Sequence, residues 1–444
     1  MSGAITDLSS AAVPSGLQVD VCVIGSGPGG ATAARILAEA GREVLVLEEG
    51  PDRTGAELNQ RELEMYDQLY MDRGGRSTED MAISVLQGRA LGGGSVINVS
   101  DVVPIPDGVL AHWRLRHGLA QMTVANLAPH KERALRDLSA GPIPDHLISQ
   151  GNRLLEQGSR KLGLAGETMQ HNRVGCVGYG TCLIGCPADA KSNSRMVAIP
   201  QAMAAGARIF VRARVVRIDD GGKEQKRILV RALDARGYHE GAEFELRART
   251  VILAAGAVGS PLLLLRSGLG NDHVGRHLML QPQLPVTALF DAPVRAFSGI
   301  PQSWAITAHE QHDDPERGLW GFRIEGIMGT PGIAASLLPA LGQPGKAMMQ
   351  RYDHMAASLL LVPDEPSGRV SAARDGRPII HYRQTEEHKG RMREAVRVAV
   401  RAWLAAGARE VVVPTAPALT IRSEADLKGV ADIDFRPATA PLIS

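Results

Sequence analysis

Three of the four cysteines of the chain fall within eleven residues, at Cys176, Cys182 and Cys186, and the last stands directly before a proline. This spacing is that of a ferredoxin cysteine run in which Tyr179 replaces the second ligand. Three thiolates can hold a three-iron cluster. Zinc is a weaker alternative, because only three ligands are local and no histidine follows at finger spacing. The same residues can also be reduced thiols that pack a loop, so the spacing leaves these alternatives open.

A second group of residues suits phosphate binding: Gly25, Gly27 and Gly30 form a GxGxxG motif. The first glycine permits a tight turn, and the second lets the backbone approach a pyrophosphate. The third allows a helix to pack closely on a strand. Glu48 ends the next apolar run, where a carboxylate can accept hydrogen bonds from a ribose. The pattern predicts a dinucleotide site, although GxGxxG alone does not distinguish FAD from NAD.

The elements around this motif form a βαβ unit. Residues 19–24 are a buried β-branched run, and a helical segment then leads to Gly41 before a second apolar run, EVLVLEEG. A right-handed crossover makes these two strands parallel neighbours. We expect residues 51–86 to be irregular, residues 110–165 to be mostly helical, and residues 207–218 to form one strand that returns to the sheet.

The pattern changes near residue 285, where short alternating strands are followed by a long helix with Thr385 as its N-cap and Gly407 at its end. The predicted fold class is α/β: a Rossmann-like FAD-binding domain with a second α+β substrate domain built on an antiparallel sheet. The expected organisation is an FAD-binding domain in two parts, 1–109 and 166–284, a helical insertion at 110–165, and a substrate-binding domain at 285–444.

Composition narrows the choice of partners. The chain has 444 residues, 44% hydrophobic and 22% charged, with a net charge of +1, which gives no reason to expect nucleic acid or an anionic membrane as partner. No export signal or apolar run of membrane-spanning length is visible, so the expected compartment is the cytoplasm. Thiols stay reduced there. Cys22, inside the first strand, is expected to be a buried core residue.

Four segments in order resemble the glucose-methanol-choline (GMC) oxidoreductases, flavoenzymes that oxidise alcohol groups. They are the stretch from VIGSGPGG to LEEGP, then GRALGGGSVIN at 88–98, VILAAGAVGSP at 251–261 and GRHLMLQP at 275–282. The resemblance implies FAD as cofactor and a small-molecule alcohol, sugar or sterol as substrate. It places the ADP half of FAD on Gly25, Gly27, Gly30 and Glu48. It assigns the pyrophosphate and isoalloxazine to Arg89, Gly92, Gly93 and Asn98, the adenine to Val215, and a close approach of the backbone to Gly256.

The resemblance also implies a catalytic histidine, which in the family stands in a His-Pro-x-Gly segment. The chain stops at ATAPLIS, residues 438–444, before any matching context, so we expect the base to be absent from these residues. His312 and His354 lie in the predicted substrate domain and are weak substitutes. The expected partner is then a complementing C-terminal polypeptide or an electron-acceptor protein. A truncated FAD-binding remnant without turnover is the alternative.

The resemblance does not decide whether the cysteine loop binds a metal cluster. Some membrane-associated sugar dehydrogenases of the family carry a three-iron cluster on a similar arrangement, which would make the chain a subunit that passes electrons onward. Cholesterol-oxidase-like and long-chain-alcohol-oxidase-like members instead resemble the GCPADAK run that ends at Lys191, and no cluster is expected in them. An NAD-dependent reductase is disfavoured, because its nucleotide-binding unit would not need the later glycine clusters.

Overall fold

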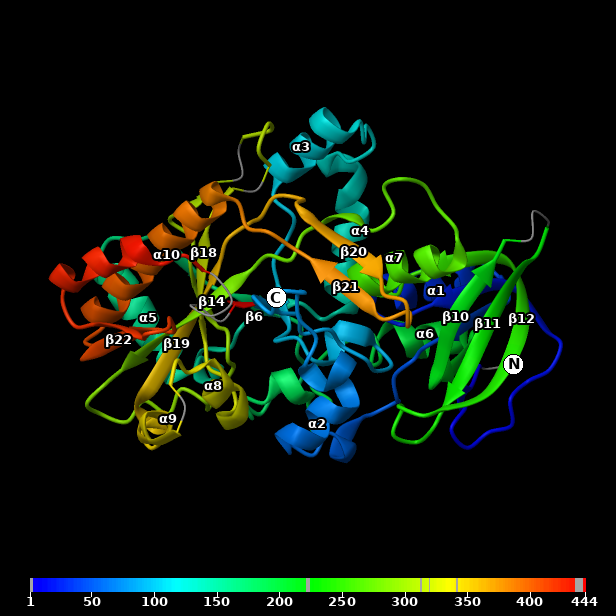
Figure 1. Ribbon diagram of the computed structural model, residues 1–444, viewed down its shortest axis with the longest axis horizontal. Helices are drawn as coiled ribbons and strands as arrows, with labels where there is room; N and C mark the ends of the chain where they lie inside the picture. The colour runs from blue at the N-terminus through cyan, green and yellow to red at the C-terminus, as the bar shows by residue number, and fades with distance from the viewer. Residues whose placement is uncertain (1–2, 221–223, 312–313, 319, 341, 436–441) are drawn as a thin grey trace.

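The computed structural model of the chain describes residues 3–220, 224–311, 314–318, 320–340, 342–435 and 442–444. Two sheets lie at opposite ends of an elongated molecule (Figure 1). The chain starts beside the first sheet, and the C-terminus lies between the two sheets. Within the described part of the chain, no helix is both long and apolar enough to cross a membrane.

The first sheet has seven strands and carries the GxGxxG turn. Its order is β1 (Ile5–Asp7), β9 (Arg208–Val211), β3 (Val44–Leu47), β2 (Leu17–Ile24), β12 (Glu240–Leu253), β11 (Lys226–Leu233) and β10 (Ala213–Asp219). The first five strands are parallel, and β10, β11 and β12 form an antiparallel meander. The βαβ prediction is therefore confirmed, with α1 (Pro28–Glu39) as the crossover helix.

Alternate residues of β2 pack on the two faces of this sheet. Val21 and Val23 share a core with α1 and with α6 (Ala198–Ala204). Cys22 and Ile24 point to the opposite face, whose core also contains Leu263 of α7 (Gly256–Ser267). Side chains that alternate between two buried faces explain the continuous apolar run in the sequence. Cys22 is fully buried, as predicted.

The returning segment 207–218 is two strands rather than the single strand predicted. Arg212 separates β9 from β10 with φ +56°, and its N–H bonds to Gly50 O. β9 pairs in parallel with β3, whereas β10 pairs antiparallel with β11. A positive φ at a non-glycine residue turns the chain between these two partners. The apolar pattern of the sequence continues through this turn without a break, so the pattern did not indicate two strands.

The second sheet has nine strands and is mainly antiparallel. Its path is β23 (Leu419–Ile421), β22 (Glu410–Val413), β14 (Gln283–Leu289), β19 (Met355–Leu361), β18 (Arg323–Ile327), β15 (Trp304–Ile306) and β7 (Gly166–Thr168). The strand β24 (Leu442–Ile443) joins β14 to β4 (Ile83–Ser84). This arrangement confirms the expected α+β second domain. β7, however, comes from the 166–284 segment that was assigned to the FAD-binding domain.

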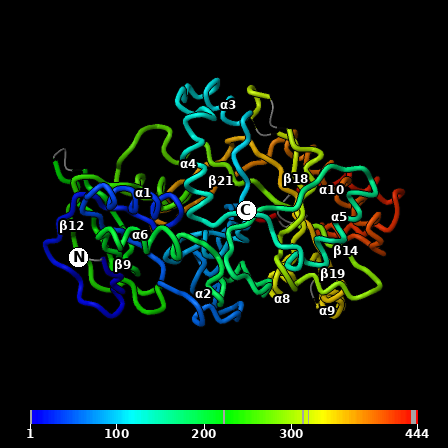
Figure 2. Tube along the Cα trace, turned by 180° about the vertical axis from the view of Figure 1, so that it is seen from behind, coloured from blue at the N-terminus to red at the C-terminus, as the bar shows by residue number. Residues whose placement is uncertain are grey.

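Helices α5 (Gln150–Lys161) and α10 (Glu386–Ala405) contact each other and the second sheet. Thr385 caps α10 as predicted, because its side chain accepts the His388 N–H. Four further helices were not predicted: α2 (Glu62–Leu69), α7, α8 (Pro331–Leu337) and α9 (Gly342–Met349). The expected helical region holds α3 (Asp107–His117), α4 (Val124–Asp137) and α5. Figure 2 shows α4 from behind, passing between the two ends of the molecule.

Small sheets complete the fold. β5 (Asp101–Val102), β8 (Gln170–His171) and β6 (Gly141–Pro142) form one, and β16 (Glu310–Gln311) pairs with β17 (Trp320–Gly321). A third sheet contains β13 (Arg276–Leu278), β20 (Gly368–Ala372) and β21 (Pro378–His381). In Figure 1 the β20–β21 hairpin lies beside α7, which brings a segment from late in the chain to the first domain.

The core of the second domain depends on Trp403 of α10. Its side chain is fully buried, its indole N–H donates to Ser358 Oγ at 3.0 Å, and its ring meets Phe290 edge-on. We expect Trp403→Ala to lower the free energy of unfolding by about 3–5 kcal/mol, because it removes this packing and leaves a cavity. Urea unfolding followed by circular dichroism measures this loss. Arg401→Ala on the same helix is the control. It removes only a surface ion pair with Glu424, so it should change the free energy of unfolding little.

Candidate functional site

Three glycine-rich segments meet at the carboxyl end of the first sheet and enclose a cavity of about 1460 Å³. Gly25 has φ +99°, and a Cβ atom there would lie 2.4 Å from Ala254 O. A Cβ atom at Gly93 would lie 2.6 Å from Gly27 Cα. The turn after β2, the loop near residue 93 and the end of β12 therefore approach at distances that only glycine permits. Clefts outside the carboxyl ends of parallel strands are where such sheets bind ligands.

The phosphate-binding part of the cavity is the N-terminus of α1. Gly27 is the N-cap of this helix, and Gly27, Pro28 and Gly29 all line the cavity. A Cβ atom at Gly27 would have Gly93 Cα, 3.9 Å away, as its nearest neighbour, so the space in front of it is open. Free N–H groups and the positive end of the helix dipole favour an anion at this position.

Glu48 is buried beside this turn and ties it to the second glycine cluster. Its Oε2 accepts the Ser26 N–H at 3.0 Å and the Ser26 hydroxyl at 2.6 Å, while Oε1 accepts the Gly50 N–H at 2.8 Å. Ser26 Oγ in turn accepts the Gly92 N–H at 2.9 Å. Burial raises the pKa of Glu48 above its ordinary value. A carboxylate has about four acceptor positions, so one remains for a ribose hydroxyl.

Ser26 was not singled out in the sequence, because it occupies a variable position of GxGxxG. The structure shows that its hydroxyl links Glu48 to Gly92 and so joins two segments that are distant in the chain.

We expect Glu48→Gln to weaken FAD binding by about tenfold or more. An amide has one oxygen and one NH₂ group, so it cannot accept from Ser26 on one side and from Gly50 on the other. The side chain then has no acceptor left for the ribose hydroxyl, and leaving that bound group unpaired costs about 1–3 kcal/mol. FAD titration monitored by quenching of flavin fluorescence measures the change. An unchanged dissociation constant would show that Glu48 does not contribute to the binding site.

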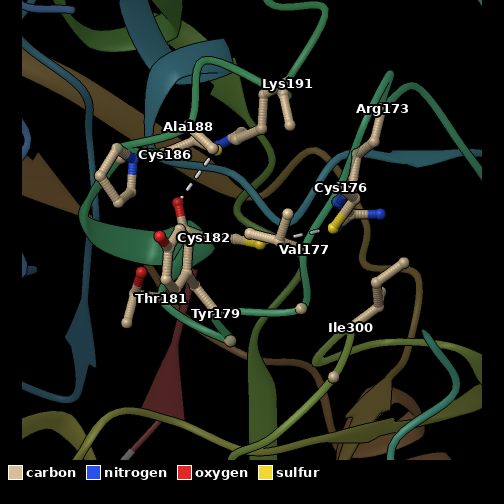
Figure 3. Close-up of a pocket in the computed structure, with 16 residues that line it drawn as sticks. Arg173, Cys176, Val177, Tyr179, Thr181, Cys182, Cys186, Ala188, Lys191 and Ile300 are labelled. Atoms are coloured by element: carbon tan, nitrogen blue, oxygen red, sulfur yellow. Dashed lines mark hydrogen bonds between the residues drawn. The ribbon is translucent and has the colours of Figure 1, made fainter. Parts of the chain in front are cut away.

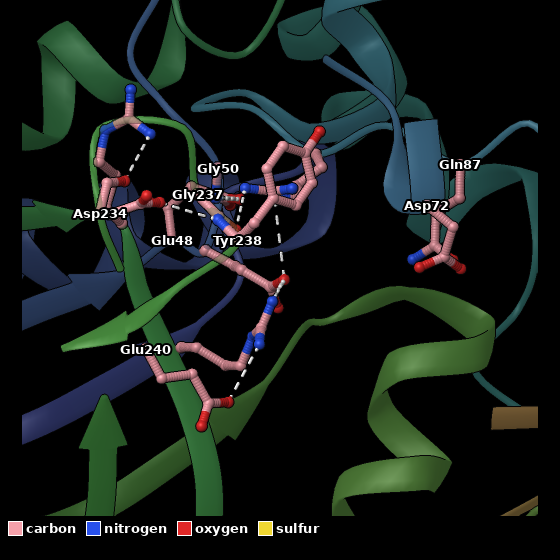
Figure 4. Close-up of polar contacts among 12 residues, drawn as sticks. Glu48, Gly50, Asp72, Gln87, Asp234, Gly237, Tyr238 and Glu240 are labelled. Carbon is pink, nitrogen blue, oxygen red and sulfur yellow. Dashed lines mark hydrogen bonds and ion pairs between the residues drawn. The ribbon is translucent and has the colours of Figure 1, made fainter. Parts of the chain in front are cut away.

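Arg89 lies on the same wall with its guanidinium almost fully buried. It donates from Nη2 to Gly237 O at 2.8 Å, and its guanidinium carbon lies 5.3 Å from the centre of the Tyr238 ring. Gly237 and Tyr238 are labelled in Figure 4. Its Nε has no hydrogen-bond partner among the described residues and lies 3.8 Å from Glu49 Oε1. Arg89 therefore places a buried positive charge on this wall, with Glu49 as its ion-pair partner. The 234–239 turn that covers it comes from the β11–β12 connection.

Seven of the ten residues predicted to bind the cofactor line this cavity: Gly25, Gly27, Glu48, Arg89, Gly93, Val215 and Gly256. Gly30 and Gly92 lie just behind the wall. A Cβ at Gly30 would be 2.0 Å from Gly25 O, which fits its expected role in helix packing. Asn98 is exposed and is not part of the lining. Its assignment to the isoalloxazine stays a prediction.

Parts of the lining could not be assigned from the sequence. The β20–β21 turn contributes Arg374 to Pro378, and Arg266 of α7 donates to Gly376 O. Ser444 also lines the cavity, because β24 places it between Ser84 and Leu86. These residues reach the cavity through pairing between distant strands, and no local motif marks them.

No described histidine lines the cavity. His354 contacts Phe290 O through Nδ1 at 3.2 Å, and Asp353 is its other neighbour. His312 lies outside the described residues. That the chain lacks the catalytic histidine therefore stays a prediction. Among the described residues, no other histidine lies on the cavity wall to replace it.

The three clustered cysteines line a second, much smaller cavity of about 20 Å³ together with Arg173 and Lys191 (Figure 3). All three are free thiols, and burial raises the pKa of Cys176. Arg173 Nη2 lies 3.7 Å from Cys182 Sγ. Lys191 Nζ donates to the carbonyl oxygens of Val96 (2.8 Å), Asn98 (2.5 Å) and Cys182 (3.1 Å).

The structure does not support the three-iron cluster assigned to Cys176, Cys182 and Cys186. Among the residues described, no three His, Cys, Asp or Glu side chains are grouped so that they could hold a metal ion. Cluster ligands must converge on one point, whereas these thiols surround a cavity about the size of a water molecule, beside two cationic side chains. Sequence spacing gave the ligand types but not their convergence. The same finding gives no support to zinc on these three residues.

Comparison with known proteins gives two family matches. A GMC oxidoreductase family model matches residues 66–283, and an FAD-binding domain model matches residues 18–94. An uncharacterized GMC-type oxidoreductase of Mycobacterium tuberculosis is 34% identical over 96% of this chain and 66% of its own length. A long-chain-alcohol oxidase of Arabidopsis thaliana is 30% identical over 89% of this chain and 53% of its own length. The chain thus spans between half and two thirds of these relatives.

Two solved structures share the fold. Pyridoxine 4-oxidase from Mesorbium loti superposes with a TM-score of 0.63 at 16% identity, covering 96% of this chain and 87% of the other. A formate oxidase of Aspergillus oryzae gives a TM-score of 0.62 at 16% identity, over 95% and 87% of the two chains. At this level of identity the likeness concerns the fold alone.

Proposed function

The chain belongs to the GMC oxidoreductase family, and on that premise we propose that it takes part in the FAD-dependent oxidation of a CH–OH group. The observation that carries the proposal is the cavity enclosed by Gly25–Gly29, Gly93 and Gly256. Its volume of about 1460 Å³ exceeds the roughly 300–1,000 Å³ of ordinary small-molecule pockets and suits a dinucleotide together with a substrate.

The residues present fit FAD. The open space before Gly27 and the N-terminus of α1 would receive the pyrophosphate, and Arg89 would add positive charge on the same wall. The remaining acceptor position of Glu48 would bind a ribose hydroxyl, and the backbone of Val215 would lie against the adenine. FAD, when bound, accepts the hydride that leaves the alcohol carbon. The FAD-binding match over residues 18–94 agrees with FAD rather than NAD.

Part of the cavity wall is apolar. Val258 and Leu262 of α7 and the segment Leu278–Leu280 belong to the lining, which also contains Arg266 and the 374–378 turn. Apolar walls bind the hydrocarbon part of an alcohol and exclude water from the reacting carbon. We therefore propose an alcohol with a sizeable apolar body, in keeping with the name of the long-chain-alcohol oxidase relative. A sugar has little apolar surface that could pack against these side chains, so it is the less favoured substrate class.

Anaerobic mixing tests this proposal. The chain is first loaded with FAD and then given primary alcohols of increasing chain length or a hexose, and the bleaching of flavin absorbance is recorded. We expect reduction by the long alcohols, tighter half-saturation with each added methylene, and no reduction by the hexose. Faster reduction by the hexose than by any long alcohol would contradict the proposed substrate class.

A second candidate is an FAD-binding protein without turnover of its own. The absence of a histidine from the described lining favours it. The same anaerobic experiment separates the two, because such a protein would bind FAD but would not reduce it with any alcohol.

A further inference from the structure

We propose that the cysteine loop is a peroxide-reactive thiol site, in which Cys182 is oxidised and then forms a reversible disulfide with a second cysteine of the loop. The site consists of Cys176, Cys182 and Cys186 around the small cavity, with Arg173 and Lys191 on its wall. It is separate from the dinucleotide cavity, since the two share no lining residue. The proposal does not depend on the proposed function.

The first argument is the unused donors of Arg173. This side chain is 6% exposed, and its Nη2 donates to Val99 O and reaches Cys182 Sγ. Its Nε and Nη1 are buried and have no hydrogen-bond partner in the described part of the chain. Buried donors left unpaired are costly, so an acceptor formed next to this guanidinium would be stabilised. A sulfenate oxygen on Cys182 would lie beside Nη2, which already contacts the sulfur.

The second argument is access. A cavity of about 20 Å³ holds one molecule of the size of water or hydrogen peroxide. Val177 and Tyr179, on the loop that covers it, are 62% and 54% exposed. Gly178 and Gly180, beside them, have φ +74° and +73° and give this cover few side-chain anchors. A small uncharged oxidant can therefore reach the thiols, whereas a bulky reagent meets the loop first.

The chemistry balances with hydrogen peroxide as the only oxidant. The Cys182 thiolate attacks one peroxide oxygen, the S–O bond forms, the O–O bond breaks, and the leaving hydroxide takes up a proton to give water. The thiolate of Cys176 or Cys186 then attacks the Cys182 sulfur. An S–S bond forms, the S–O bond breaks, and a second water leaves. In total two thiols are oxidised while one peroxide is reduced to two waters.

Lys191 connects the cysteine loop to the segment that follows Gly93 in the dinucleotide cavity. Its ammonium is almost fully buried and holds the Cys182 carbonyl together with the carbonyls of Val96 and Asn98. Closing a disulfide moves the backbone at residue 182, so one of these three hydrogen bonds is expected to lengthen. The loop that contains Gly93 is then connected to the redox state of the cysteines.

The chain offers a direct test, because trypsin releases all three cysteines in one peptide, residues 174–191. The full chain is treated with hydrogen peroxide, unfolded, alkylated and digested, and the peptide is analysed by mass spectrometry. We expect loss of two of its three alkylatable thiols and of two hydrogens from its mass, with full recovery after dithiothreitol. Cys22, fully buried and with a pKa raised to about 12, should stay alkylatable throughout.

Met81, which is 77% exposed, reports whether enough peroxide was present. If Met81 becomes the sulfoxide while the peptide keeps three alkylatable thiols, or gains only irreversible sulfonic acids, the proposal is wrong. Cys182→Ser should abolish the disulfide, and a dimedone adduct at Cys182 should appear in the wild type during the reaction. Should Cys182→Ser fail to fold, the wild-type result and the dimedone adduct still decide.

Discussion

Gly27→Val is expected to yield a folded protein that is colourless after reconstitution with excess FAD. In the structure a Cβ at position 27 meets nothing closer than Gly93 Cα at 3.9 Å, so the fold can accept a side chain there. The two methyl groups of valine would, however, project into the space in front of the α1 N-terminus that a pyrophosphate must occupy. FAD content per protein should fall from near one to near zero, while the circular dichroism spectrum is unchanged.

Two other glycines provide controls. Gly390 of α10 is not part of the cavity lining and has open space around its Cβ position, so Gly390→Ala should retain FAD. Gly30 would place a Cβ 2.0 Å from Gly25 O, so Gly30→Val should disturb the fold itself and lower the unfolding temperature. Wild-type flavin content in Gly27→Val would contradict the assignment of residues 25–30 to the pyrophosphate.

What the sequence predicted well at this site is local. The GxGxxG turn, its helix and Glu48 lie within one βαβ unit, and each residue type there is required by backbone geometry or by a ribose. Ser26 illustrates the limit of this local information. Its hydroxyl forms hydrogen bonds with both Glu48 and Gly92, but the sequence of residues 25–30 does not indicate a partner at residue 92.

Features set by distant pairing could not be predicted. The β20–β21 turn and Ser444 reach the cavity because β13 pairs with β20 and β24 lies between β14 and β4. Short strands of two or three residues carry too little periodicity to be recognised. The metal site predicted on the cysteines was wrong for a related reason. Their spacing along the chain limits how far apart they can be, but it does not determine how the three side chains group in space.

The largest kinetic effect is expected from a histidine base, a residue type that the described cavity wall lacks. A positioned general base contributes about 10²–10⁴-fold to a proton transfer of this kind. Residues 1–444 loaded with FAD should therefore reduce their flavin slowly when an alcohol is added without oxygen. Added imidazole should accelerate this step, since it supplies a neutral base with a pKa near that of histidine, about 6.5, and is small enough to enter a cavity of about 1460 Å³.

The pH dependence distinguishes rescue by a base from a general solvent effect. Only neutral imidazole can accept a proton, so the acceleration should be nearly full above about pH 7.5 and should fall to about a tenth at about pH 5.5, at equal total imidazole and ionic strength. Sodium chloride matched to the imidazolium concentration is the control. Fast reduction without imidazole, unaffected by its addition, would show that a group within residues 1–444 already acts as the base. Substitution of His354, and of His312 outside the described residues, would then identify or exclude the two histidines singled out in the second domain.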